Sequence, residues 1–452
     1  MNLAMGALVN LGRNTITGML CTTGQQFKDW SAACRLFSTP RFNPEELFAV
    51  ARRTVAEKLD RESPFVVSID DTHLHKTGKK VHGAAWKRDP MGPRFQTNLI
   101  WAQRFLQISA CLPVKEQPGP AITVPIAFLH APSPKKPQKS ANEEEWTAYK
   151  QTSKKMNLGT MAAEQIKKLR AGLDEDGNAG TLLWVNGDGG YTNQKILRAL
   201  PERTVFTGRI RKDAALHFPP VSTEQPGPGR KRHYGQVAPT PEELRQDERH
   251  PWQTVEAWAA GNVHTFRVKT LDRVQWRTAG AACLLRMVVI APLGYRLRKG
   301  AKLLYRQPAY LICSDSEQPL EWLIQHYLWR WGIEVNHRDE KQLIGVGDAQ
   351  VRTKQAVANV PAFLVAAYAL LRLSARLACD DTGHTQTLPP PRWNRRNTPQ
   401  PTCTTRVIQQ LRAELWGMAL RHNFYDFVNK PESTTKPEKY KPELAAAVLY
   451  VA

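Results

Sequence analysis

The sequence predicts an α/β fold in which a mixed β-sheet is flanked by helices, with a mostly β insertion and helical regions at both ends. Three observations lead to this prediction. Short apolar, β-branched runs such as residues 65–69 and 181–185 read as buried strands, and segments of helical periodicity lie between such runs. A stretch in the second half of the chain carries strand patterns only, and both ends of the chain carry helical patterns.

Residues 1–63 are predicted to be helical. Asn43 and Pro44 have the residue types of an N-cap and a first helical position, and Glu46 stands in capping-box register. Before them, residues 15–23 and 27–37 read as two short helices on either side of a glycine turn, which would suit a helix-turn-helix. Plain helical packing is an equally good interpretation of these two helices. We expect this region to contact DNA.

The central domain is expected to start at residue 64 and to be interrupted once. Its first part, residues 64–210, contains the predicted strands 65–69, 99–105, 106–112, 122–129, 181–185 and 204–210 and the predicted helices 142–173, with a break near Gly159, and 192–200. Its second part, residues 318–379, is predicted to contain helices 319–344 and 356–378.

The interruption, residues 211–317, is predicted to be a β-rich insertion. Its first half is rich in proline, glycine and charge, and its second half shows strand patterns at residues 264–270, 273–277, 283–290 and 303–314. The chain ends with residues 380–452, which combine a proline-rich linker over 380–402 with a predicted helix at 404–421.

Composition narrows the class of partner. The 452 residues include 63 Lys and Arg against 41 Asp and Glu, which gives a formal net charge of +22 and favours a polyanion such as nucleic acid. Seven cysteines without a CxxC pair exclude a disulfide framework and a cysteine-rich zinc ribbon. The apolar segment 363–371 is too short to span a bilayer, and we read no signal peptide, so a cytoplasmic protein without a membrane partner is expected.

Acidic residues follow two of the predicted strands. Asp70 and Asp71 end the strand that begins at residue 65, and Asp188 follows the strand at 181–185. Ligands of α/β sheets gather where strands end, so two acidic strand ends indicate a site there. The doublet leaves open whether Asp70 or Asp71 belongs to it.

A second set of chemical groups lies on the helix predicted at 319–344. At about 100° per residue, Tyr327, Arg330, Glu334 and Lys341 fall within a stripe about 60° wide. The alternative is a solvated helix face on which Arg330 and Glu334 form an i,i+4 ion pair worth only about 0.3–0.5 kcal/mol.

Together, the two strand ends and the helix suggest three converging carboxylates. Such a group repels itself unless divalent cations lie within it, and hard oxygen ligands favour Mg²⁺ or Mn²⁺. Two such ions would clamp the attacking and leaving oxygens of a phosphodiester displacement. Arg330 and Lys341 would then hold phosphate oxygens, and Tyr327 would hydrogen-bond or stack.

Other side chains in the sequence could also bind DNA or a metal ion. Basic clusters in the insertion are predicted to bind DNA through Arg211, Lys212, Arg230, Lys231 and Arg232. His73 and His75 could be a zinc pair, but exposed hairpin histidines are the better interpretation. Trp258 and Trp276 could stack on an unpaired base, although burial is favoured for both. The absence of a GxxxxGK[ST] motif gives no support to an ATP-driven motor.

These residues resemble those of a known family. The spacing Tyr327-x2-Arg330-x3-Glu334-x6-Lys341 matches the Y-R-E-K signature of DDE transposases of bacterial insertion sequences. Residues 69–72 resemble the first-aspartate motif of that group, D-x-T, whose register favours Asp70 over Asp71, and residues 188–191 resemble its second motif, D-x-G-Y/F. The likeness covers roughly residues 64–378, including a β-strand insertion before the glutamate.

The resemblance implies an RNase H-like fold, metal ligation by Asp70, Asp188 and Glu334, and two Mg²⁺ ions for which Mn²⁺ substitutes. It further implies cleavage at transposon terminal repeats and transfer of the 3′-OH into target DNA, by a homodimer in the bacterial cytoplasm. Two alternatives stay open: an RNase H-like DNA endonuclease without strand transfer, and a domesticated transposase that acts as a DNA-binding protein.

Overall fold

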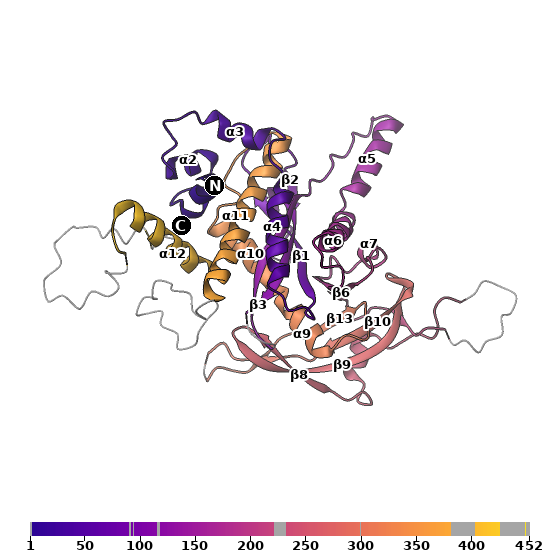
Figure 1. The fold of residues 1–452 in the computed structure, drawn as a ribbon. Coiled ribbons are helices and arrows are strands. Elements are labelled where there is room, and N and C mark those ends of the chain that lie inside the picture. The colour runs from indigo at the N-terminus through magenta and orange to yellow at the C-terminus, as the bar shows by residue number, and fades with distance from the viewer. Residues whose placement is uncertain are drawn as a thin grey trace, which may run out of the picture.

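We describe the chain from a computed structural model. The structure describes residues 2–89, 92–93, 95–114, 118–220, 232–298, 300–380, 403–424 and 448. Figure 1 shows a central sheet with helices on both sides and the strands of the insertion at one end.

The centre of the sheet has the strand order β4-β3-β1-β5-β6. The β1–β3 and β3–β4 pairs are antiparallel, whereas β1–β5 and β5–β6 are parallel. This is the arrangement of an RNase H-like fold, so the predicted fold class is confirmed. The strands are β1 (Phe65–His75), β3 (Leu99–Pro113), β4 (Ala121–His130), β5 (Leu183–Gly187) and β6 (Thr204–Arg209).

Two predicted strands are in fact one. Residues 99–105 and 106–112 both belong to β3, because no turn residue separates them and both edges of β3 find partners. The short β2 (Ala85–Arg88) pairs with the start of β3, and β4 pairs with the rest. Strand β1 likewise continues past the predicted end of its apolar run, to His75.

Helices cover both faces of this sheet. Helices α4 (Pro44–Glu57) and α6 (Leu158–Glu175) pack on the face that carries Phe65, Val67 and Ile69. Helix α9 (Leu320–Trp329) packs on the other face, which carries Val66. Helix α10 (Trp331–Gln342) continues from α9 along β1, β3 and β4.

The helix predicted at 142–173 is broken near Gly159, as expected. It forms α5 (Glu143–Lys155) and α6, and the break falls at Asn157, whose side chain caps α6 by accepting a hydrogen bond from the Gly159 backbone N–H. No residue of α5 is buried, and Figure 1 shows this helix projecting away from the rest of the molecule. The short α7 (Gln194–Leu197) occupies part of the helix predicted at 192–200.

The insertion extends the central sheet. Strand β13 (Ala309–Cys313) pairs with β6, and β10 (Gly280–Ile290), β9 (Asn262–Trp276) and β8 (Gln253–Ala259) follow in order. The predicted strands 264–270 and 273–277 are a single β9, and the strand predicted at 303–314 divides into β12 (Leu304–Tyr305) and β13. Strand β8 was not predicted. The remaining elements are β7 (Leu216–His217), α8 (Pro241–Gln246) and β11 (Gly294–Tyr295).

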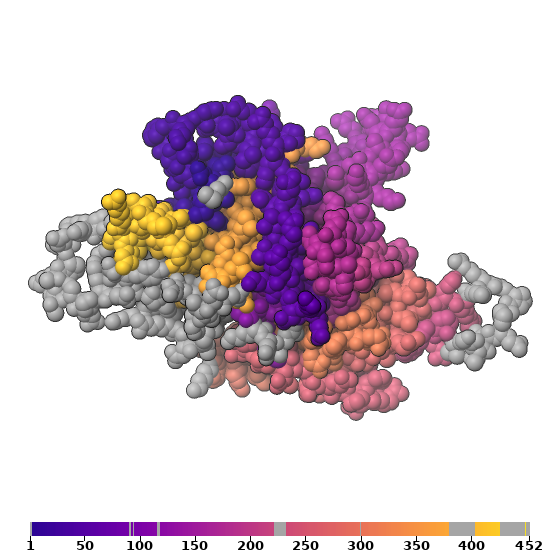
Figure 2. Space-filling view, viewed as in Figure 1, coloured from indigo at the N-terminus to yellow at the C-terminus, as the bar shows by residue number. Residues whose placement is uncertain are grey.

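The N-terminal helices pack on the C-terminal ones. Helices α1 (Asn2–Val9), α2 (Ile16–Thr22) and α3 (Ser31–Ser38), all within the region predicted to be helical, share a core with α11 (Lys354–Asp380) and α12 (Thr404–Leu420). Phe37 lies edge-on to Phe363 at 5.3 Å between ring centroids. Figure 2 shows the surface of α12, in yellow, beside the N-terminal helices in indigo. The expected linker 380–402 lies almost wholly outside the described residues.

The apolar segment 363–371 is part of a much longer helix than expected. By length and composition alone, residues Lys354–Ala378 of α11 could cross a membrane, but most of this stretch is buried inside the protein. The helix packs against β4, α4 and α3, and this burial accounts for its apolar sequence.

Candidate active site

Asp70 and Asp188 lie at neighbouring strand ends. In the parallel β1–β5 ladder Ile69 is paired with Gly187, so the residues that follow them, Asp70 and Asp188, continue two strands that run side by side about 4.8 Å apart. Asp70 is still within β1, and Asp188 is the first residue after β5. Two carboxylates therefore meet at the carboxyl end of adjacent parallel strands, where the sequence predicted a site.

A tight turn fixes the Asp188 side chain. Its Oδ1 accepts hydrogen bonds from the backbone N–H of Gly190 at 2.8 Å and of Tyr191 at 3.2 Å. The Thr192 hydroxyl donates to the Asp188 carbonyl at 2.8 Å. These bonds occupy one carboxylate oxygen and hold the turn that follows β5.

Asp70 and Asp71 face opposite sides of the sheet, because side chains alternate along a strand. Asp71 shares its face with Val67 and Ile69 and accepts a hydrogen bond from the Tyr191 hydroxyl at 2.9 Å. Asp70 faces α9 and α10, and its carboxylate feels the charges of Asp188 and Arg330. Only Asp70 is on the side of the sheet that carries the helix with Glu334.

The helix predicted at 319–344 is interrupted at Arg330, which separates α9 from α10. The Arg330 guanidinium donates to Glu334 Oε1 at 3.0 Å and lies 5.8 Å from the centroid of the Tyr327 ring. The Arg330 side chain is 15% exposed and that of Glu334 is 34% exposed. The Arg330–Glu334 pair is therefore not the solvated surface pair of the alternative interpretation. The Arg330 side chain is largely buried, and its charge also acts on Asp70.

Gly332 sets how closely α10 approaches the sheet. A β-carbon at this position would lie 2.9 Å from the β-carbon of Thr123 on β4 and would overlap its hydroxyl oxygen. Thr123 is itself buried. The missing side chain therefore lets the helix backbone pack directly on β4, between Arg330 and Glu334 in the sequence.

Burial and neighbouring charges change the acidity of the site. Burial, followed by the charges of Asp188 and Asp71, raises the pKa of Asp70 to about 7 in spite of a hydrogen bond from the Asp71 backbone. Burial alone would lower the pKa of Arg330, but Tyr327, Glu334 and Asp70 together raise it. Although solvent reaches Lys341, partial desolvation by the surrounding protein lowers its pKa, against the influence of Glu340 and Asp70.

The site offers two oxygen donors to a divalent cation, without a complete set of ligands. Within the described ranges no three His, Cys, Asp or Glu side chains stand in an arrangement that could hold a metal ion. Glu334 is paired with Arg330, whose guanidinium supplies the positive charge next to Asp70. The partly buried Asp70 and Asp188 carboxylates are hard oxygen ligands, the kind that Mg²⁺ prefers.

Two buried residues beside the site were missed. Gln107 is the cross-strand neighbour of Asp70, and its Nε2 donates to Glu340 Oε1 at 2.9 Å. Glu340 is 1% exposed, and burial raises its pKa to about 8. At about 100° per residue, Glu340 lies off the stripe that contains Glu334, so the helical pattern did not point to it. The stripe gives no information about which off-stripe residue lies against the sheet.

The other predicted residues are placed as follows. Lys341 is exposed at the end of α10. Arg211 and Lys212 are exposed, and Arg211 pairs with Asp213 at 2.9 Å. Arg232 is exposed, whereas Arg230 and Lys231 lie outside the described residues.

The structure also places the tryptophans that could stack on a base and the histidines that could bind zinc. Trp276 is partly buried against the main core, and Trp258 is partly buried with its backbone N–H bonded to Gln325. His75 is exposed, and His73 is half-buried. Neither histidine belongs to a three-residue metal group among the described residues.

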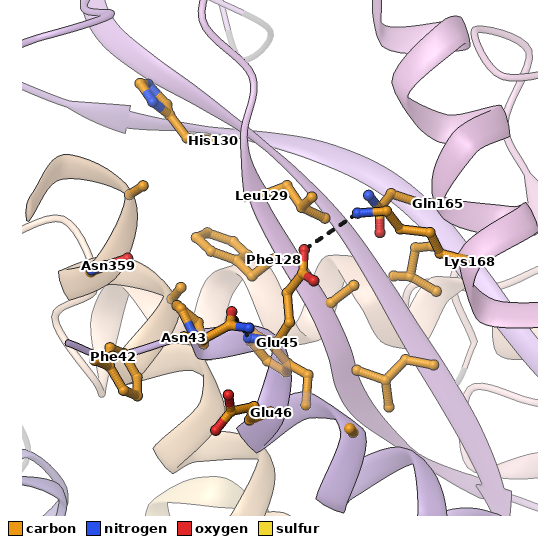
Figure 3. A pocket seen from close by; sticks show the side chains of 18 of the residues that line it. Phe42, Asn43, Glu45, Glu46, Phe128, Leu129, His130, Gln165, Lys168 and Asn359 are labelled. Atoms are coloured by element: carbon orange, nitrogen blue, oxygen red, sulfur yellow. Dashed lines mark hydrogen bonds and ion pairs between the residues drawn. The ribbon is translucent and has the colours of Figure 1, made fainter. Parts of the chain in front are cut away.

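A cavity of about 680 Å³ lies elsewhere, between α4, β4, α6 and α11. Figure 3 shows Phe128 and Leu129 beside it, with the ion pair between Glu45 of α4 and Lys168 of α6 at 3.5 Å. None of the predicted site residues lines this cavity. The carboxylates instead lie at the end of the sheet.

The strand order and the paired acidic strand ends define an RNase H-like protein with an acidic site. Residues 2–282, more than half of the chain, match the family described as DDE superfamily endonuclease, and the chain belongs to this family. No curated protein matches the chain. The matched residues include Asp70 and Asp188 and end before α9 and α10, so Glu334 and its neighbours lie outside the match.

Proposed function

We propose that the protein is a DNA transposase that cuts transposon ends and joins the released 3′-OH to target DNA. The observation that carries this proposal is the adjacency of Asp70 and Asp188, with Arg330 bridging electrostatically from Asp70 to Glu334. Membership of the DDE superfamily endonuclease family supports DNA cleavage, and nucleases of this superfamily generally use divalent metals. Action as a homodimer on double-stranded DNA in the cytoplasm goes with this proposal.

Asp70, Asp188 and Glu334 would hold Mg²⁺, with Mn²⁺ as a substitute. Bound there, the ions would supply Lewis-acid stabilisation of the attacking and leaving oxygens of the phosphodiester. For Glu334 to take part, its hydrogen bond from Arg330 must open or be shared.

The remaining groups would orient the DNA. Arg330 can present two parallel N–H donors to phosphate oxygens once Glu334 releases it. Tyr327 holds the guanidinium against its ring, so the arginine stays at the site while it changes partner. Lys341 would contact the backbone as a point charge further along α10.

The reaction has two displacements. In the first, water attacks the phosphorus at the transposon end, the bond from phosphorus to the 3′ oxygen breaks, and a 3′-OH and a 5′-phosphate are released. In the second, the 3′-OH attacks a target phosphodiester and displaces a 3′ oxygen there. An endonuclease without strand transfer performs only the first displacement, and the family description favours that step in particular.

The test uses a labelled duplex that carries the terminal repeats of the encoding element, with Mg²⁺ and a supercoiled target plasmid. The Glu334→Gln variant should bind the duplex with unchanged affinity and fail to cleave it. Glu321→Gln, an exposed acid on α9, is the matched control and should cleave normally. Cleavage by Glu334→Gln at the wild-type rate would refute the assignment, and cleavage without joined plasmid products would identify the endonuclease.

A further inference from the structure

A second cavity, of about 360 Å³, lies where the N-terminal region meets the end of α10. Its walls are the loop of residues 10–14, the last turn of α10 with the residues after it, and α12. Figures 1 and 2 show that these segments, far apart in the sequence, come together on one side of the molecule. No role for this cavity follows from the carboxylate site alone.

Positive charge predominates in the cavity. Arg13, Lys341 and Arg412 line it, against Asp348 as the one carboxylate among the described lining residues. Asp348 already accepts a hydrogen bond from the Asn14 backbone N–H at 2.9 Å. Arg13 and Lys341 are exposed, whereas Arg412 is buried. Such an arrangement attracts an anion that can reach it from solvent.

The loop that carries Arg13 is held in one conformation. The Asn10 side chain accepts from the Gly12 N–H at 3.1 Å and donates to the Arg13 carbonyl at 3.0 Å. The Arg412 guanidinium donates to the Asn10 carbonyl at 2.7 Å. The buried Asn14 side chain donates to the Ile344 carbonyl at 2.7 Å, which ties the loop to the end of α10. The wall is therefore preorganised for a ligand.

The cavity is at a defined position relative to Glu334. Lys341 is seven residues after Glu334 on the same stripe of α10, which corresponds to about 10 Å along the helix axis. One strand of B-DNA carries a phosphate about every 3.4 Å of its axis. A strand whose scissile phosphate is at Glu334 and which follows α10 therefore brings roughly its third neighbouring phosphate to this cavity.

We propose that this cavity binds a backbone phosphate of the DNA substrate, about three nucleotides from the scissile bond, and that Arg13 is a DNA-binding residue. The proposal rests on the proposed function for the location of the scissile phosphate. It connects the N-terminal region to the catalytic helix through the DNA, in addition to the hydrogen bonds of Asn14.

The test measures binding of a fluorescein-labelled duplex by anisotropy at several salt concentrations, without cleavage. Arg13→Ala should reduce the slope of log affinity against log salt by about one, as expected for the loss of one phosphate contact, and Arg13→Lys should largely restore it. Arg249→Ala is the control. Arg249 is 89% exposed, carries the same charge as Arg13 and is far from Arg13 in the sequence, where it pairs with Asp247. Equal slopes for wild type and Arg13→Ala would overturn the proposal.

A second arm locates the phosphate. A methylphosphonate at the third position from the scissile bond should weaken binding by the wild type but not by Arg13→Ala. Equal weakening of both proteins would mean that the cavity is not a DNA phosphate site. The binding result does not depend on cleavage, so failure here leaves the Glu334→Gln test of the proposed function intact.

Discussion

Asp70 and Asp71 are consecutive residues of β1, yet Asp70 faces α10 and Asp71 receives the Tyr191 hydroxyl at 2.9 Å on the opposite face of the sheet. The two carboxylates therefore differ in surroundings although the sequence offers them as equals. Asp70 is in the electrostatic field of Asp188 and Arg330, and Asp71 is a hydrogen-bond acceptor within the packing of the turn after β5.

This difference predicts opposite outcomes for two matched variants. Asp70→Asn should lower DNA cleavage by more than the roughly 10–100-fold that loss of an outer-shell partner of a metal costs. Asp71→Asn keeps an oxygen that accepts from Tyr191, so cleavage should fall by less than about tenfold while unfolding becomes about 1 kcal/mol easier. Cleavage rates and denaturant unfolding of both variants test this, and an active Asp70→Asn with an inactive Asp71→Asn would reverse the assignment.

The raised pKa of Asp70 predicts a pH-dependent effect of metal on stability. Its folded pKa is about 7, against about 3.9 in unfolded chains, so protonation favours the folded state. The stability that this group contributes is complete below about pH 4 and is lost as the pH rises through 7. In EDTA, Asp70→Asn should therefore melt increasingly above the wild type between about pH 5 and 8. Mg²⁺ should raise the wild-type melting temperature more at about pH 8 than at pH 6.

The control for this effect is internal. Glu340, whose pKa is also raised, is present in both proteins, so the difference between wild type and Asp70→Asn isolates Asp70. Thermal melts with EDTA and with Mg²⁺ across this pH range give the comparison. A constant difference between the two proteins at all pH values would contradict a titrating Asp70.

Much of the architecture was accessible from the sequence. The apolar runs predicted β4, β5 and β6 with small boundary errors and the start of β1, because strands with little exposed surface leave a continuous apolar signal. The position of Asp188 after β5 was predicted for the same reason. The pairing of β1 with β5 was not, since it depends on contacts between residues more than a hundred positions apart.

Tertiary contacts decided the features that sequence reasoning missed. Tyr191 selects between Asp70 and Asp71 only because the turn after β5 folds back onto β1. Glu340 is buried because β3 brings Gln107 beneath α10, and no local pattern marks that contact. The break at Arg330 likewise has no proline or cap to announce it.

Arg330 is predicted to act on DNA more than on folding. Arg330→Ala should reduce the free energy of unfolding by only about 1 kcal/mol, because Glu334 is one-third exposed and can be hydrated when its partner is lost. Cleavage should fall by orders of magnitude, since no other group replaces its paired donors. Lys167→Ala, which removes an ion pair with Glu164 on α6 in which both side chains are at least half exposed, should change both quantities little.

The competing role for Arg330 is that of a buried structural tie. Removal would then cost about 3–5 kcal/mol and the loss of cleavage would follow from unfolding. Denaturant melts of Arg330→Ala and Lys167→Ala at the assay temperature separate the two roles. A folded Arg330→Ala protein that cleaves normally would contradict both.

Gly332 is predicted to be required for the placement of Glu334 relative to Asp70. In Gly332→Ala the new methyl group would overlap the Thr123 hydroxyl and come within 2.9 Å of its β-carbon, so α10 must move away from β4. Such overpacking should cost about 1–3 kcal/mol in the free energy of unfolding. It should also lower cleavage more than DNA binding, because the helix shift separates Glu334 from the strand-end aspartates while the surface charges stay.

Thr123→Ala removes the overlapping hydroxyl but not the β-carbon, so the Gly332→Ala/Thr123→Ala double variant should recover part of the lost stability. Gly180→Ala is the matched control, since nothing lies within 4 Å of the position of its β-carbon. Unchanged cleavage and stability in Gly332→Ala would show that the helix position tolerates the methyl group and that the close approach to β4 is not needed for the site.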